Sequence, residues 1–336
     1  MKPKTYSQAG VDTHLAGELK GAIAGLAAGT LGPEVLAGPG PFAGLYQLQG
    51  YREPLLVASA DGMGTKLKLA AAHGRHHGLG RDLVHHCTND ILTSGAKPLF
   101  LLDYIAADRL RPQVIEEIIR GLAEACRGVG CALLGGETAE MPGVYREGEH
   151  DLVGFIVGAV EKDRVIEGRD IAHGDRVLAL PSSGLHTNGY SLVRSVFNLD
   201  ASPSAMDRLY PELGRTLGEA LLEPHRCYLR ELEPWLPHIK GMAHITGGGL
   251  EGNLPRCLPS GVGVRIHKDS WQAPPLFRFI QEAGPVAEAE MFRTFNMGVG
   301  MAIVLSPQQA DRVKSALPTA FLIGEVVAGE RRVTIE

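Results

Sequence analysis

The chain has 336 residues, a length typical of about two domains. Hydrophobic residues make up 44% and charged residues 21%, so the chain can bury an ordinary core and is expected to be globular. The net charge of −5 argues against a nucleic-acid-binding surface, and no run approaches the ~18 apolar residues that a membrane helix needs. Five cysteines without a CxxC pair, together with a polar N-terminus, favour a reduced, cytoplasmic protein.

The first half of the chain is predicted to alternate strands and helices. Periodicity and glycine or proline breaks predict a helix at 11–28, a loop at 38–44, a strand at 55–59, helices at 67–72 and 82–94, a strand at 98–106, a helix at 112–129, and strands at 132–134 and 151–160. Proline at the first turn supports the helix at 112–129.

The second half restarts after a charged segment, residues 161–175. We place the domain boundary there and predict domains over residues 1–165 and 166–336. The elements predicted beyond it are strands at 176–180, 244–246, 262–266, 299–305 and 320–327, and helices from about 189 and at 213–224, 225–236, 275–283 and 307–316. Strands alternate with helices in both halves, so the predicted class is α/β or α+β.

DGMGTKL, which begins at Asp61, is the most informative segment of the first half. Gly62 and Gly64 would let backbone N–H groups approach a polyphosphate, and Thr65 adds a hydroxyl. Lys66 offers a positive charge, and Asp61 offers a hard oxygen ligand for Mg²⁺. The segment is not a Walker A loop, because GxxxxGK[ST] does not occur in the chain. A plain strand-to-helix turn is the alternative interpretation.

Two further acidic motifs could complete a nucleotide site, one inside a helix and one in GGETAEMPG. They contribute Asn89, Asp90, Gly135, Gly136, Glu137 and Thr138. A carboxylate about 4 Å from a phosphate charge is repelled by ~4 kcal/mol at an effective dielectric of 20. If ATP binds here, Asp61, Asp90 and Glu137 are therefore expected to hold Mg²⁺, which would hold the phosphates. Turn former, helix charge and capping acid are the structural alternatives.

Two glycine-containing motifs stand out in the second half. SSGLHTNGYSLVR follows a strand and enters a helix whose N-terminus could receive an anionic oxygen. HITGGGLEGNLPR carries three successive glycines that suggest a phosphate nest, and Pro255 argues against a Rossmann interpretation of its GxGxxG match. The candidate substrate residues are Ser183, Gly184, His186, Thr187, Asn188, Thr246, Gly247, Gly248 and Gly249. His186, Asn188 and Asp61 are the catalytic candidates, although a lone loop histidine such as His186 is more often simply solvated.

The motifs together are familiar. AGVD (9–12), DGMGTKL, CTND (87–90), FLLDYIA (100–106), GGETAEMPGVY (135–145), SSGLHTNGYSLVR, HITGGGLEGNLPR and TFNMGVGM (294–301) resemble the phosphoribosylformylglycinamidine cyclo-ligase, or AIR synthetase, family. The resemblance implies an α/β N-terminal domain that pairs strands across a homodimer, with ATP sites near the interface. It also implies a C-terminal mixed sheet with helices.

The activity that the resemblance implies is ATP-driven ring closure in purine synthesis. Formylglycinamidine ribonucleotide would become aminoimidazole ribonucleotide, with ADP and phosphate released. By resemblance, Lys66 would touch ATP phosphates, His186 and Asn188 would face the substrate, and residues 247–249 would take its 5′-phosphate. Met63 replaces a usual valine, and a lysine common in the lead-in helix is replaced by Ala24, with Lys20 one turn earlier.

Other members of the same superfamily are the main rivals. A selenophosphate synthetase would be expected to carry a reactive cysteine or selenocysteine in the glycine-rich N-terminal segment, residues 1 to about 50. No cysteine precedes Cys87. Thiamine-monophosphate kinase would leave the second-half motifs less well explained. A glutamine-using amidotransferase would need a glutaminase nucleophile and a longer chain. A non-catalytic nucleotide-binding scaffold could dispense with His186 and Asn188.

Overall fold

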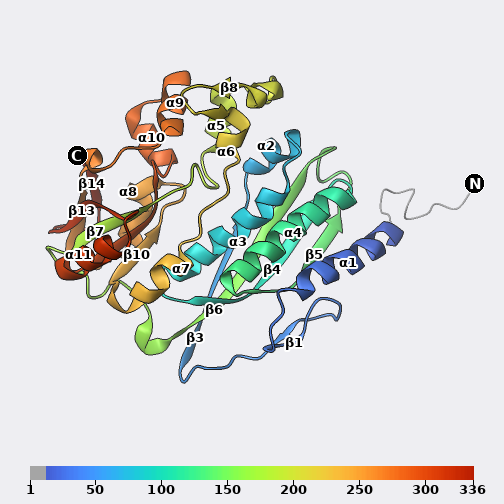
Figure 1. The fold of residues 1–336 in the computed structure, drawn as a ribbon, viewed down its shortest axis with the longest axis horizontal. Coiled ribbons are helices and arrows are strands. Elements are labelled where there is room, and N and C mark those ends of the chain that lie inside the picture. Colours follow the sequence, from blue (N-terminus) through green and yellow to red (C-terminus); the bar gives the residue numbers. More distant parts are fainter. Residues whose placement is uncertain (1–12) are drawn as a thin grey trace, which may run out of the picture. The chain divides into compact units, whose positions relative to one another are not determined.

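The computed structural model describes residues 13–336, so the AGVD motif lies outside the described residues. The chain divides into two compact units. The N-terminal unit contains the residues up to Ile91 and Lys97–Glu161, and the C-terminal unit contains Leu92–Ala96 and Lys162–Glu336. Each unit has its own sheet (Figure 1). The boundary after residue 165 stays a prediction of the sequence.

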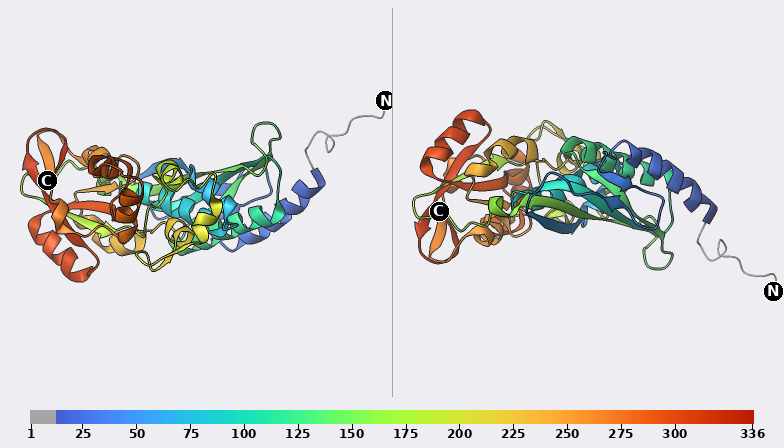
Figure 2. Two further views of the ribbon diagram at one scale, coloured as in Figure 1. Left: turned by 90° about the horizontal axis from the view of Figure 1, so that it is seen from above. Right: turned by 90° about the horizontal axis from the view of Figure 1, so that it is seen from below.

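The N-terminal unit is a four-stranded sheet with helices on one side. Its elements are α1 (Thr13–Ala28), β1 (Val35–Ala37), β2 (Leu45–Tyr46), β3 (Pro54–Gly62), α2 (Lys66–Ala72), α3 (His77–Leu92), β4 (Lys97–Ala107), α4 (Pro112–Val129), β5 (Ala132–Glu140) and β6 (His150–Glu161). The strand order is β3-β6-β4-β5, in which only β4 and β5 run parallel. Figures 1 and 2 show α3 and α4 on the same side of this sheet.

The two faces of this sheet differ in solvent exposure. Gly154 faces α3, since a Cβ added there would contact Leu83. Leu56, Phe155 and Leu102 lie on the opposite face and are 66%, 48% and 37% exposed. Successive residues of a strand point to opposite faces, so one face is packed and the other is an open apolar surface.

Local sequence accounts for α4 and for its position. Pro112 occupies the first turn, where its missing N–H costs no hydrogen bond, and Gly130 ends the helix with a left-handed φ of 69°. Its buried stripe includes Ile115, Ile118 and Leu122, spaced three or four residues apart. Burial of this stripe fixes the helix against the sheet.

The C-terminal unit is built on a six-stranded sheet. Its elements are η2 (Lys162–Arg164), β7 (Arg176–Pro181), α5 (Tyr190–Val196), η3 (Pro203–Asp207), β8 (Leu209–Tyr210), β9 (Arg215–Thr216), α6 (Leu217–Leu221), α7 (Leu229–Leu232), η4 (Glu233–His238), β10 (Gly241–His244), α8 (Gly249–Asn253), η5 (Leu254–Cys257), β11 (Val262–Ile266), η6 (Lys268–Ser270), α9 (Pro275–Ala283), α10 (Glu288–Thr294), β12 (Val299–Leu305), α11 (Pro307–Ala316), β13 (Phe321–Ala328) and β14 (Val333–Ile335).

The order of this sheet is β10-β12-β7-β13-β11-β14, antiparallel except for β11 with β14. Every residue of β12 is buried, which means that both faces of the sheet are covered there. One face packs on Leu250, Leu254 and Leu258 from α8, η5 and the residue after it. The ends of β7 and β10 carry the two motifs singled out in the second half.

The mixed α/β class with two domains is confirmed, and most strands and helices agree with the sequence prediction to within a few residues. The helices predicted at 213–224 and 225–236 are wrong in extent. Thr216 and Glu219 form a capping box that starts α6 at Leu217, and Pro224 and Pro234 lie shortly after the ends of α6 and α7. Among residues 13–336, no helix is long and apolar enough to cross a membrane.

Candidate functional site

Two of the predicted metal ligands meet in the N-terminal unit. Asp61 lies near the end of β3, and Asp90 lies on α3. His86, one turn before Asp90 on α3, places its Nε2 2.7 Å from Asp61 Oδ2 and 4.0 Å from Asp90 Oδ2. Ser59 Oγ donates a hydrogen bond to Asp90 Oδ2 at 3.0 Å, and Gly62 N–H donates to Asp61 Oδ1 at 3.0 Å. We call Ser59, Asp61, His86 and Asp90 the acidic cluster.

The electrostatics of the acidic cluster favour a cation. Burial alone would lower the pKa of His86, but the hydrogen bond and charge of Asp61, with the charge of Asp90, raise it above the ordinary value. Burial raises the pKa of the neighbouring Cys87 thiol far above its usual range, which disfavours the nucleophilic thiolate form. Two carboxylates beside a hydroxyl form a hard oxygen donor set, which fits Mg²⁺.

Lys66 forms a buried ion pair within the N-terminal unit. It is the first residue of α2, and its Nζ lies 2.5 Å from Asp82 Oδ2, with both side chains only 1% exposed. Breaking a buried ion pair by removing one partner typically costs 3–5 kcal/mol. The pair links α2 to α3, and a contact of Lys66 with ATP phosphates stays a prediction of the sequence.

Glu137 does not join the acidic cluster within one chain. Asp61, Gly154, Asp103 and Gly136 share one row across β3, β6, β4 and β5. Glu137 is the next residue along β5, so it points to the opposite, open face. It is also three strands from Asp61, about 14 Å at ~4.8 Å per strand. Among residues 13–336, Glu137 belongs to no group of three or more His, Cys, Asp or Glu side chains whose ligand atoms all lie within 4.8 Å of one another.

The other residues predicted to bind the nucleotide lie at the start of α2, on α3 and on β5. Gly64 has a left-handed φ of 54°, which its glycine identity allows, and precedes Thr65 at the start of α2. Asn89 is fully buried on α3. Gly135 and Thr138 flank Gly136 and Glu137 on β5. Gly136 is required by the close approach of β4 and β5, since a Cβ there would collide with Asp103.

Asp103 is a titratable group to which the sequence analysis assigned no role. It lies in FLLDYIA on β4, faces the helix side of the sheet and is 6% exposed. Burial raises its pKa to about 7, and the charge of Glu137 adds to that rise, although a hydrogen bond from its own backbone opposes it. The alternation of LFLLDYIA would have placed one acid on the core face, which is the signal that could have identified it.

The loop after β7 holds most of the predicted substrate residues, and its own contacts fix it. Ser183 N–H donates to His186 Nε2 at 3.2 Å, and Ser183 Oγ donates to Pro224 O at 2.6 Å. His186 has a left-handed φ of 62° and is 1% exposed. Neutral His186 therefore carries its proton on Nδ1, because Nε2 accepts. The histidine is a structural part of its loop rather than a solvated surface residue.

The glycine loop, residues 245–249, lies beside the loop after β7. A Cβ at Gly247 would be 3.1 Å from Asn188 Oδ1, so these two predicted substrate residues are neighbours. Asn188 Nδ2 donates to Thr187 Oγ1 at 3.4 Å. Gly248 and Gly249 have φ values of 96° and 59°, and a Cβ at Gly249 would collide with Phe292 O. The left-handed backbone explains the glycines at residues 248 and 249.

Two asparagines that were not predicted as site residues hold these loops. Asn253 Nδ2 donates to Gly249 O at 2.8 Å, Gly247 O at 3.2 Å and Thr246 O at 3.3 Å. Asn296 accepts from Ser182 Oγ at 2.9 Å and from Gly298 N–H at 2.8 Å, and donates to Gly184 O at 2.9 Å. Both asparagines occur in quoted motifs, but a side chain that binds distant backbone leaves no local sequence signal.

The chain matches two family models in sequence order. Residues 43–160 match the N-terminal domain of AIR synthase related proteins, and residues 172–336 match the C-terminal domain. Among curated relatives, a phosphoribosylformylglycinamidine cyclo-ligase of Desulfitobacterium hafniense is 48% identical over 330 residues, with 96% of each chain covered. The cyclo-ligase of Sorangium cellulosum is 50% identical over 333 residues, covering 96% of this chain and 95% of its own.

Solved structures share the fold at low sequence identity. Thiamine-monophosphate kinase from Stenotrophomonas maltophilia has a TM-score of 0.67 at 17% identity, covering 93% of this chain and 94% of its own. HypE of E. coli has a TM-score of 0.64 at 18% identity, covering 95% and 93%. A hydrogenase maturation protein HypE in complex with ATP has a TM-score of 0.61 at 17% identity, covering 93% and 88%. These likenesses establish the architecture, whereas the end-to-end identity establishes descent: the chain belongs to the AIR synthase family, within the group of phosphoribosylformylglycinamidine cyclo-ligases.

Proposed function

We propose that this chain catalyses the ATP-dependent cyclisation of formylglycinamidine ribonucleotide to aminoimidazole ribonucleotide in purine biosynthesis, as a ligase that forms a C–N bond. The observation that carries the proposal is the 48% identity to a named cyclo-ligase over 96% of both chains. The motifs of both units fall within the aligned length.

The chemistry explains why the reaction consumes ATP. The formyl oxygen is a poor leaving group, so it first attacks the γ-phosphorus and ADP departs. The amidine nitrogen then attacks the formyl carbon, the C–O bond breaks, and inorganic phosphate leaves. The formyl amide nitrogen and the attacking amidine nitrogen each lose a proton, and transfer of a proton from the ring methylene to the exocyclic nitrogen gives the aromatic aminoimidazole. The phosphoryl step needs positioning and charge stabilisation rather than a covalent protein intermediate.

In the N-terminal unit, Asp61 and Asp90 are the proposed ligands of Mg²⁺. Their carboxylates already lie around one imidazole, which supports their sharing one ion. A bound Mg²⁺ would neutralise phosphate charge on ATP. The backbone of residues 62–65, with Asn89, is proposed to bind ATP. Glu137 as a metal ligand and Lys66 as a contact of the ATP phosphates stay sequence predictions.

In the C-terminal unit, the loop after β7 and the glycine loop are proposed to bind the substrate. Asn188 offers an amide to a polar group, and the backbone at Gly247 and Gly248 is proposed to receive the 5′-phosphate. The contact between Asn188 and Gly247 supports joint action of the two loops. His186 is proposed to orient the loop between Ser183 and Asn188, because its Nε2 accepts from Ser183 N–H.

A homodimer is the proposed assembly. The support is the open face of the N-terminal sheet, where Leu56, Phe155 and Leu102 are exposed together. An apolar patch of this kind on a soluble protein commonly marks an interface. The cytoplasm is the proposed compartment, supported by the five free cysteines.

Turnover with purified protein tests the proposal. ADP release should depend on formylglycinamidine ribonucleotide and should match aminoimidazole ribonucleotide formation one to one. ATP hydrolysis without cyclised product would instead favour another kinase or synthetase of the superfamily. ATP binding without any turnover would favour a nucleotide-binding scaffold.

A further inference from the structure

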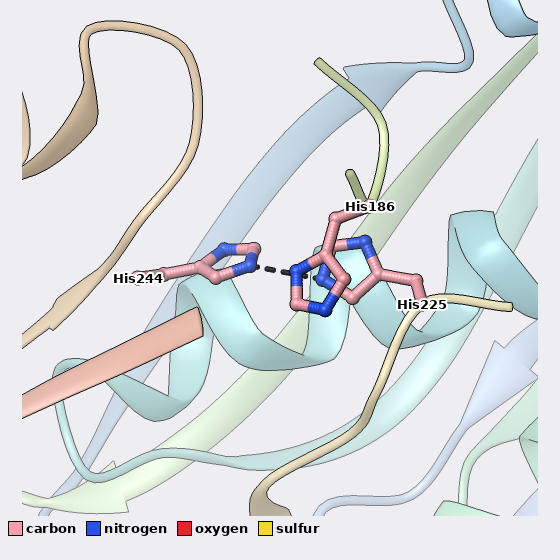
Figure 3. Close-up of side chains that lie close together, drawn as sticks. All are labelled: His186, His225 and His244. Atoms are coloured by element: carbon pink, nitrogen blue, oxygen red, sulfur yellow. Dashed lines mark hydrogen bonds between the residues drawn. The ribbon is translucent and has the colours of Figure 1, made fainter. Parts of the chain in front are cut away.

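Three histidines from separate segments of the C-terminal unit form a buried cluster (Figure 3). His186 belongs to the loop after β7, His225 lies between α6 and α7, and His244 is the last residue of β10. They are 1%, 1% and 5% exposed. The proposed reaction gives His225 and His244 no role, and three buried imidazoles are an unusual way to fill a core. We call them the histidine cluster.

His225 is the centre of the cluster. Its Nε2 lies 3.0 Å from His244 Nε2, the contact drawn as a dashed line in Figure 3. Its ring stacks on His186 with centroids 3.9 Å apart and an angle of 20° between the planes. A hydrogen bond between two Nε2 atoms needs a proton on one and a lone pair on the other. When both rings are neutral, they must therefore be opposite tautomers.

The ring geometry favours a hydrogen-bonded stack over a metal centre. Lone pairs that bind one ion must point to a common position. The rings of His186 and His225 are nearly parallel, so their in-plane lone pairs run side by side instead of converging. His186 Nε2 is also already an acceptor for Ser183 N–H.

The segment that carries His225 is hydrogen-bonded to the loop after β7 and to the residues next to that loop. Three hydrogen bonds do this, from Ser183 Oγ to Pro224 O (2.6 Å), from Tyr228 Oη to Pro181 O (2.9 Å) and from Tyr190 Oη to Leu221 O (2.6 Å). His225 therefore moves with that loop. Its hydrogen bond to His244 reaches the strand that leads directly into the glycine loop.

We infer that His225 is a positioning residue that sets the tautomer and orientation of His244 and thereby couples the loop after β7 to the glycine loop. It touches no reacting atom in this role. The consequence for substrate binding rests on the proposed function, whereas the hydrogen-bonded histidine pair does not.

The first test observes the pair itself in the intact protein. With ¹⁵N-labelled histidine, the imidazole spectra should contain the signal of an Nε2–H tautomer and the signal of an Nδ1–H tautomer from the pair, and both signals should change in His225→Leu. This substitution keeps apolar volume but removes the hydrogen bond. His173→Leu, at an exposed histidine of the same unit, is the matched control and should change neither signal. An unchanged His244 signal in His225→Leu would overturn the inference, as would wild-type signals of a metal-bound imidazole.

The second test measures the coupling. In His225→Leu, the KM for formylglycinamidine ribonucleotide should rise about tenfold, the effect of one lost hydrogen bond to a buried group, while the KM for ATP stays within about twofold. His225→Gln, which can still hydrogen-bond, should recover most of the loss. Equal rises in both KM values would reduce His225 to a general structural residue and refute the inference. If wild-type protein does not cyclise the substrate, the proposed function fails, and the spectra alone decide the histidine pair. If His225→Leu does not fold, the wild-type and His225→Gln spectra decide it.

Discussion

Replacing Asp103 by asparagine should stabilise the protein at alkaline pH but not at acid pH. Asp103 is buried on β4, and its pKa is raised from 3.8 to about 7. In the unfolded chain the Asp103 carboxyl group loses its proton near pH 4, whereas in the folded chain the carboxyl group stays protonated up to about pH 7. Between these values the folded state binds more protons, so stability falls as pH rises. A shift of about 3 units at 1.36 kcal/mol each gives a cost of about 4 kcal/mol above pH 7.

Asp103→Asn removes the charge and therefore this cost. The gain in unfolding free energy over wild type should grow from near zero at pH 4 to at most about 4 kcal/mol at pH 8, since local relaxation reduces it. Hydrogen exchange of the β4 and β5 amides measures stability locally, which avoids assuming that both units unfold together. Glu147→Gln, at an exposed acid of the same unit, is the control and should give no such slope.

A ¹³C titration of the Asp103 carboxyl provides a direct check. A midpoint near 4 would refute the reasoning, because burial would then impose no cost on the charge. A difference between Asp103→Asn and wild type that is constant with pH would refute it as well.

Three further predictions concern the acidic cluster, the open sheet face and the loop after β7. Asp90→Asn should weaken Mg²⁺–ATP binding by up to about a thousandfold in calorimetric titration, since a unit charge pair at 4 Å is worth ~4 kcal/mol at a dielectric of 20; unchanged affinity would remove Asp90 from the metal site. Phe155→Glu should convert a dimer to a monomer by light scattering, and a monomeric wild type would contradict the proposed assembly. Asn296→Ala should lower the stability of the C-terminal unit by about 3 kcal/mol, because three hydrogen bonds are lost with buried partners. Fluorescence of Trp271, whose indole N–H donates to Met297 O, follows that unfolding, and an unchanged midpoint would contradict it.

Elements bounded by strong local signals could be predicted from the sequence. The helix at 112–129 was placed to the residue because Pro112 and Gly130 mark its two ends. The helices predicted at 213–236 failed because hydrophobic spacing outweighed the capping box at Thr216 and the prolines after it.

The site was predictable as motifs but not as geometry. Asp61 and Asp90 meet through His86, which lies outside the motifs quoted from the sequence. Glu137 points away because strand order and pairing register, both long-range properties, decide its face. The ion pair of Lys66 with Asp82 depends likewise on how α2 packs against α3.

Transfer of isotope from substrate to phosphate tests the central claim most directly. With ¹⁸O in the formyl group of formylglycinamidine ribonucleotide, cyclisation through a phosphorylated formyl oxygen must deliver the label to inorganic phosphate. Mass spectrometry of the phosphate should therefore find one ¹⁸O atom for each aminoimidazole ribonucleotide formed. Label released into water, with unlabelled phosphate, would contradict phosphorylation of that oxygen and with it the role assigned to ATP.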